Sequence, residues 1–114
     1  MRPYNFTTVT TTPALTLIHG EAVALLGLTA TNAEAAIYYL KFWWGGNKAT
    51  ELPVIGTTVP SLTIAIPVGG LIPCEFNHPL QGGGPCWVAA TLNAVYSDDS
   101  ALATGGDIVT LFID

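Results

Sequence analysis

The stretch Ile37-Tyr38-Tyr39-Leu40-Lys41-Phe42-Trp43-Trp44, ended by Gly45-Gly46-Asn47, is the strongest strand signal in the chain. Aromatic and β-branched residues favour strands, whereas glycine and asparagine favour turns. Successive side chains of a strand point to opposite faces. We therefore expect one face to pack in the core: Tyr38, Leu40, Phe42 and Trp44. Lys41 marks the opposite face, with Ile37, Tyr39 and Trp43, as the wetter one.

Shorter strand signals flank this stretch on both sides. Leu62–Ile66 alternates cleanly, so Leu62, Ile64 and Ile66 are expected to face inward. The other predicted strands are Ala14–Ile18, Ala22–Thr29, Leu71–Phe76, Cys86–Leu92 and Asp107–Ile113. Such short strands at spacings of roughly 8 to 12 residues, without a convincing helical period, are typical of β-sandwiches. We predict an all-β fold: a single antiparallel β-sandwich of seven or eight strands, jelly-roll-like or Ig-like, over residues 13–114.

Residues 1–12 precede this sandwich and contain the threonine-rich run Phe6–Thr12, which cannot form a core alone. We expect an extended N-terminal arm here. Such an arm either adds a strand to the edge of a neighbouring sheet or forms the first strand of its own domain. Tyr4, Phe6 and Val9 are its interface candidates.

The composition is unusually poor in charge. Half of the 114 residues are hydrophobic and 10% are charged, against roughly a quarter in typical soluble domains. A surface short of charge suggests contact with protein rather than water, which favours an oligomer or an assembly component.

The net charge is −5, and Arg2, Lys41 and Lys48 are the only cationic residues, which argues against nucleic-acid binding. No stretch approaches the roughly 18 to 20 apolar residues of a membrane-spanning helix. The N-terminal sequence also lacks the apolar core of a signal peptide, so we expect a protein made in a cytoplasm.

The titratable residues form no recognisable catalytic or metal-binding motif. His19 and His78 each stand beside a turn residue, and neither belongs to a catalytic pattern. We therefore predict no enzymatic activity, no cofactor and no metal site. Cys74 and Cys86 are either two reduced thiols or a disulfide across the Gly82–Pro85 loop.

The wetter face of the aromatic strand supplies further interface candidates. Tyr39, Lys41 and Trp43 are either ordinary strand surface or a contact patch for a partner, because aromatic residues are enriched at interfaces.

The central block resembles a family of small virion proteins of tailed bacteriophages. Its motifs are Tyr39-Leu40-Lys41-Phe42, Asn47-Lys48-Ala49-Thr50, Pro53 with Gly56-Thr57, and Val59-Pro60-Ser61 running on to Ile66-Pro67-Val68-Gly69-Gly70. The similarity is strong in the middle third and loose at the ends. The chain departs from the family at Trp43-Trp44, where one tyrosine is usual, and in the insertion Leu71–Pro85.

The resemblance implies a non-enzymatic β-sandwich of the virion: a decoration, cement or fibre-associated subunit. On this basis we expect a capsid decoration protein that binds the major capsid protein and stabilises the shell, as a homo-oligomer for which a trimer is compatible with capsid symmetry. A tail or fibre position is the alternative. A different class is a carbohydrate-binding module that presents Trp43, Trp44 and Trp87 to sugar rings.

Overall fold

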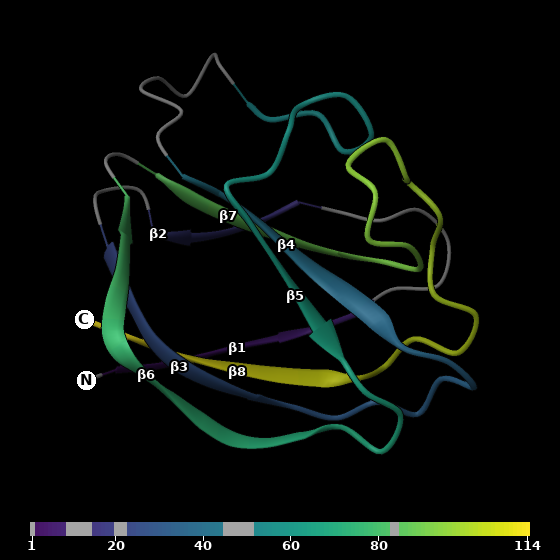
Figure 1. Ribbon diagram of the computed structural model, residues 1–114, viewed down its shortest axis with the longest axis horizontal. Helices are drawn as coiled ribbons and strands as arrows, with labels where there is room; N and C mark the ends of the chain where they lie inside the picture. The colour runs from purple at the N-terminus through teal and green to yellow at the C-terminus, as the bar shows by residue number, and fades with distance from the viewer. Residues whose placement is uncertain (1, 9–14, 20–22, 45–51, 83–84) are drawn as a thin grey trace.

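The computed structural model describes residues 2–8, 15–19, 23–44, 52–82 and 85–114 (Figure 1). These residues form eight strands and no helix. The part of the chain that the structure describes therefore contains no membrane-spanning helix. The strands are β1 (Arg2–Thr7), β2 (Thr16–His19), β3 (Val23–Ala30), β4 (Tyr38–Trp44), β5 (Leu62–Ile66), β6 (Leu71–Gly82), β7 (Cys86–Thr91) and β8 (Ile108–Ile113).

The strands make two four-stranded antiparallel sheets, in the orders β1-β8-β3-β6 and β2-β7-β4-β5, which pack face to face (Figure 1). β1 pairs with β8, β2 with β7, β3 with β6 and β4 with β5, as if one long hairpin had been rolled up. This nesting is the jelly-roll arrangement. The predicted all-β sandwich is confirmed, and its topology is that of a jelly roll.

The core lies between the two sheets and follows the predicted alternation. Tyr38, Leu40 and Phe42 of β4 are fully buried, opposite Leu28 and Leu111 of the other sheet. In β5 the predicted inward set also holds, because Ile66 is buried and the side chains at 62 and 64 pack against the core. The intervening positions 63 and 65 are exposed.

β3 departs from simple alternation. Its register shifts between Leu25 and Gly27 against both neighbouring strands. Against β8 the one extra residue belongs to β3, whereas against β6 the extra residues belong to β6. An extra residue in a strand turns the side chains that follow it. Leu25 and Leu28, three positions apart, are therefore both buried in the core.

The N-terminal stretch is part of the chain's own sheet. β1 pairs with β8 along its full length, from Arg2 opposite Ile113 to Thr7 opposite Ile108. Tyr4 and Phe6 are half-buried against the core, and the Tyr4 hydroxyl donates to the carbonyl of Leu17 at 3.0 Å. Of the two alternatives, residues 2–7 thus form a strand of their own domain. Val9 lies outside the described residues.

β6 is twice as long as predicted, continuing from Phe76 to Gly82. Its second half pairs with the start of β3, where Gly82 lies opposite Val23 and Leu80 opposite Leu25. The polar residues and glycines of this segment favoured a loop, and pairing with a distant strand overrides that local preference.

One end of the sandwich is held by two buried carboxylates. Asp107 accepts hydrogen bonds from the backbone N–H of Ala33 at 2.6 Å and from the hydroxyl of Thr8 at 3.2 Å. Glu34 accepts from the backbone N–H groups of residues 104 and 105 at 2.7 and 3.0 Å. These bonds join three loop segments, and hydrogen bonding of this kind is what allows a carboxylate to be buried.

Candidate functional site

The outer face of the β2-β7-β4-β5 sheet is covered by two loops, residues 52–61 and 92–100. The sequence pattern predicted that Lys41 would make this face wet, and that prediction is wrong. Lys41 is 0% exposed, and its ammonium donates to the carbonyls of Val95 at 2.8 Å and Asp98 at 3.1 Å. Burial lowers the pKa of Lys41, while the charges of Asp98 and Asp99 oppose that shift.

The 92–100 loop is organised around the carboxylate of Asp98. This carboxylate accepts from the backbone and side-chain N–H of Asn93 at 2.9 and 3.2 Å and from the hydroxyl of Ser100 at 2.8 Å. Burial raises the pKa of Asp98, but the hydrogen bonds from Ser100 and Asn93 outweigh it and leave the pKa below its usual value. The charges of Lys41 and Asp98 are therefore both used to fix this loop.

The 52–61 loop covers Trp43. The Thr58 hydroxyl accepts from the Val54 N–H at 2.9 Å, and the Thr58 N–H donates to the Val54 carbonyl at 2.8 Å, which closes a turn. The carbonyl of Thr58 then accepts from Trp43 Nε1 at 3.0 Å. Trp43 lies on the same face as Lys41, as predicted, but it is only 4% exposed, and Tyr39 is half-buried.

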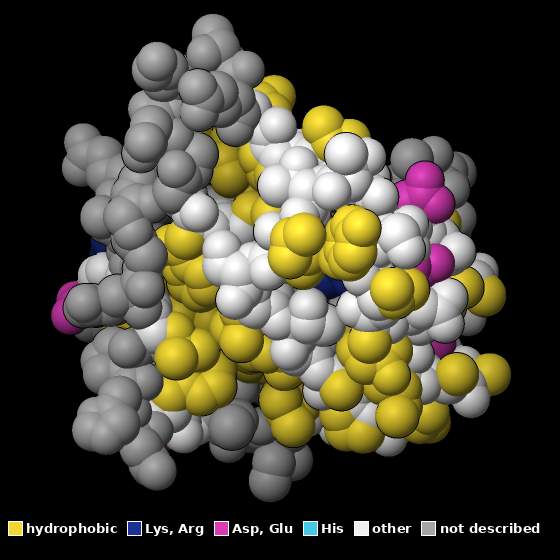
Figure 2. All heavy atoms as spheres, turned by 45° about the horizontal axis from the view of Figure 1, so that its top comes forward, with side chains coloured by type: hydrophobic (Ala, Val, Ile, Leu, Met, Phe, Trp, Pro, Cys, Tyr) yellow, Lys and Arg dark blue, Asp and Glu magenta, His cyan; other side chains and the backbone are white. Residues whose placement is uncertain are grey.

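The two covering loops turn apolar side chains to the outside. We call this set the outer apolar face; its members, 47 to 66% exposed, are Leu52, Val54, Val59, Val95 and Tyr96. Figure 2 shows hydrophobic side chains gathered on this side of the molecule. The loops meet where Gly56 lies against Asp99, since a Cβ on that glycine would be 3.3 Å from the Asp99 Cβ.

Charged residues are scarce along these segments. None occurs from Leu52 to Cys74 or from Leu92 to Ser97. Monomeric proteins seldom expose large apolar patches, and those that do usually bind a partner there. The strand patterns of the sequence did not predict this face; its signal was the set of apolar residues Leu52, Val54 and Val59 in a turn-rich loop without charge.

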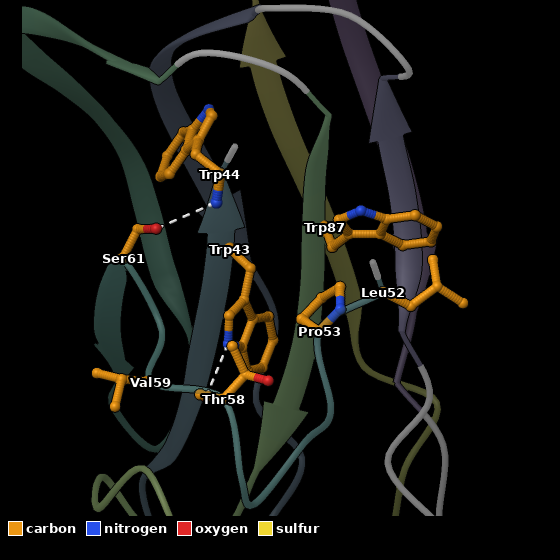
Figure 3. A pocket seen from close by; sticks show the side chains of 8 residues that line it. All are labelled: Trp43, Trp44, Leu52, Pro53, Thr58, Val59, Ser61 and Trp87. Atoms are coloured by element: carbon orange, nitrogen blue, oxygen red, sulfur yellow. Dashed lines mark hydrogen bonds between the residues drawn. The ribbon is translucent and has the colours of Figure 1, made fainter. Parts of the chain in front are cut away.

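A hollow of about 250 Å³ lies at the edge of the 52–61 loop (Figure 3). Its lining residues are Trp43, Trp44, Leu52, Pro53, Thr58, Val59, Ser61 and Trp87. Trp43 and Trp87 are cross-strand partners on β4 and β7, so their side chains share one face of the sheet. Leu52, Pro53 and Val59 complete an apolar lining from the loop.

The structure brings the three tryptophans of the sequence into this one hollow, but not as a flat platform. The ring of Trp44 stacks on Phe42, with centroids 5.8 Å apart, and Figure 3 shows it turned away from the ring of Trp43. Among the described residues its Nε1 is buried without a hydrogen-bond partner. Trp43 is covered, whereas Trp44 and Trp87 are both half-buried.

The remaining sequence candidates do not join this site. Cys86 is a buried free thiol, and burial raises its pKa to about 12. Of the two alternatives for the cysteines, the disulfide is therefore not formed in this structure. The side chains of Cys74, His19 and His78 lie outside what the structure describes. Over the described residues, no group of three or more His, Cys, Asp or Glu could hold a metal ion.

Comparison with known proteins adds no relative. No protein-family model, no curated protein and no solved structure matches the chain.

Proposed function

We propose that the protein is a non-enzymatic structural subunit that binds another protein through its outer apolar face. The observation that carries this proposal is the pair of covering loops, which hold Leu52, Val54 and Val59 on one side and Val95 and Tyr96 on the other in exposed positions. Apolar and aromatic side chains without charge are typical of the central part of protein–protein interfaces.

We further propose a phage virion as the setting, with the major capsid protein as the partner and the shell surface as the location. The block that resembles small virion proteins runs from Tyr39 to Gly70. It contains most of β4, the 52–61 loop and β5, which supply seven of the eight residues that line the hollow and three of the five members of the outer apolar face. Jelly rolls include viral capsid domains, although a fold alone does not decide a function.

A binding assay tests this function. The purified protein is mixed with shells assembled from the major capsid protein of the same genome, and co-sedimentation is measured across a concentration series. We expect saturable binding and a higher melting temperature of the decorated shell, because a ligand that binds only the folded assembly stabilises it. Purified tails are the parallel sample. Binding to tails alone moves the protein to the tail or fibre, and binding to neither refutes the virion setting.

Mass measurement of the free protein tests the expected homo-oligomer. Analytical ultracentrifugation over a hundredfold range of concentration separates a stable trimer from a monomer. A protein that stays monomeric in solution and on the shell contradicts the oligomer but not the binding.

A further inference from the structure

We propose that β5 pairs edge to edge with β5 of a second copy of this chain, antiparallel and across a two-fold axis. The β2-β7-β4-β5 sheets of the two copies then join into one continuous sheet. This inference rests on the homo-oligomer expected under the proposed function, because it names the contact between the copies. It does not depend on the capsid as a partner.

β5 is an open sheet edge. It lies at the end of its sheet and pairs with β4 alone, from Leu62 opposite Phe42 to Ile66 opposite Tyr38. Among the strands that the structure describes, none lies along its other side. Such an edge presents backbone N–H and C=O groups that can pair with another strand. The Ile66 carbonyl accepts from the side chain of Asn32 at 3.0 Å, which ends the free edge there.

The other edges of the two sheets carry features that oppose such pairing. Natural edge strands are protected by charges, prolines, irregular register or short length. β1 contains Arg2 and Pro3. β6 contains two prolines and shifts its register against β3, and β2 has only four residues and a register shift. β5 contains neither a charge nor a proline, and its pairing with β4 is regular over five residues.

The lack of charge along this edge favours a second copy as the partner. No charged residue occurs from Leu52 to Cys74, a segment that includes β5 and the turns on both sides of it. Two copies with a net charge of −5 each repel one another where their acids meet, but this segment brings no acid to the contact. It also offers no charge that would attract a basic or an acidic partner.

The side chains of β5 are self-complementary in an antiparallel pair. A two-fold axis at Ile64 places this residue opposite its own copy, and Thr63 opposite Ala65 of the second copy. Thr63 and Ala65 are exposed, small and uncharged, so they can lie opposite each other without repulsion. Leu62 and Ile64 pack against the core but are only half-buried. A second strand along this edge covers them further.

Sedimentation and NMR over a concentration series test the pairing. We expect a monomer–dimer equilibrium with a dissociation constant of roughly 10 to 1,000 µM, because an edge of five residues makes an interface of small size. The backbone N–H signals of residues 62–66 should shift as the dimer forms. In a mixture of ¹⁵N-labelled and ¹³C-labelled protein, we expect NOEs between Thr63 of one copy and Ala65 of the other.

A matched pair of variants locates the contact. Ala65 lies on β5 and Ala103 in the loop before β8, and both are exposed. Ala65→Lys and Ala103→Lys make the same change in side chain and net charge. Lysine on an edge strand is a natural block to edge pairing, so we expect Ala65→Lys to raise the dissociation constant at least about tenfold and Ala103→Lys to stay within about twofold. Urea unfolding of both variants checks that the fold is intact.

Four results overturn the proposal: a protein that stays monomeric at about 1 mM, a trimer, a dimer that Ala65→Lys does not weaken, or a dimer whose NOEs lie on the outer apolar face. Signals of β5 that respond to shells and not to dilution assign this edge to a strand of another protein and also refute the second copy. A monomer that binds shells refutes the pairing and leaves the virion function intact. A β5-linked dimer that binds no shells supports the pairing and refutes the virion setting.

Discussion

Replacing Lys41 by methionine removes the charge that holds the 92–100 loop on the sheet. Methionine keeps the length and the apolar stem of the side chain and gives up the ammonium. The carbonyls of Val95 and Asp98 then lose a donor at 2.8 and 3.1 Å. Hydrogen bonds from charged groups contribute about 1.5 to 3 kcal/mol each, which sets an upper limit of roughly 6 kcal/mol for two.

Two effects reduce that limit. The Val95 carbonyl keeps the Asp98 N–H, which donates to it at 3.0 Å. Burial of the ammonium also costs free energy, as the lowered pKa of Lys41 indicates. We therefore expect Lys41→Met to lower the free energy of unfolding by about 1 to 3 kcal/mol. Arg2→Met is the matched control, because it removes the same charge from an exposed position and should cost less than about 0.5 kcal/mol.

Urea unfolding followed by tryptophan fluorescence gives the global value, and hydrogen exchange gives the local one. The Leu92 N–H, which donates to the Ser100 carbonyl, and the Asp98 N–H report on the loop. Each 1.4 kcal/mol of local stability lost raises their exchange rates about tenfold. If Lys41→Met unfolds within about 0.5 kcal/mol of wild type and leaves both exchange rates unchanged, the buried ammonium does not hold the loop.

Three further predictions concern the scaffold. Gly70→Ala should lower the free energy of unfolding by about 2 to 4 kcal/mol, because a Cβ at this positive φ collides with the Ala30 carbonyl. Gly69→Ala, whose Cβ meets no atom within 4 Å, should lower it by about 1 kcal/mol. Equal unfolding midpoints of the two variants in urea contradict this difference. Asp107→Ala should cost about 2 to 4 kcal/mol by leaving two donors unpaired, and a calorimetric melting temperature within about 2 °C of wild type contradicts it. Burial raises the pKa of Cys86 to about 12, so its contribution to stability is complete below the ordinary thiol pKa of about 8.5 and is lost as the pH rises through about 12. Between about pH 8 and 11, Cys86→Ala should therefore lose less stability than wild type. Equal losses for the two proteins in urea unfolding at each pH contradict the raised pKa.

The sequence predicted the two-sheet sandwich, because strands that bury one face show alternating apolar residues. Alternation in β4 placed Tyr38, Leu40 and Phe42 in the core, and alternation in β5 did the same for Ile66. β3 shows where such reasoning ends. Its register shift depends on two neighbouring strands at once, and its one local signal is Gly27, because an isolated glycine in a strand often marks a bulge.

The candidate site was less predictable, because its residues are brought together by tertiary contacts. Lys41 on a half-polar strand face is expected to reach water. Its partners, the carbonyls of residues 95 and 98, lie more than fifty positions away in the chain. Trp43 was likewise covered by Thr58, from a loop that carries only turn signals. The composition did predict a surface poor in charge, but not where that surface lies.

The charges of this chain explain why the apolar face exists. Lys41, Glu34 and Asp107 are buried, and Asp98 is half-buried, each bonded to backbone groups of a loop. Charged side chains that would normally keep a small domain soluble instead hold loops in place. The same loops then place Val59, Val95 and other apolar side chains outward. Large exposed apolar patches are uncommon on monomeric proteins, and this face is therefore the basis of our proposal that another protein covers it.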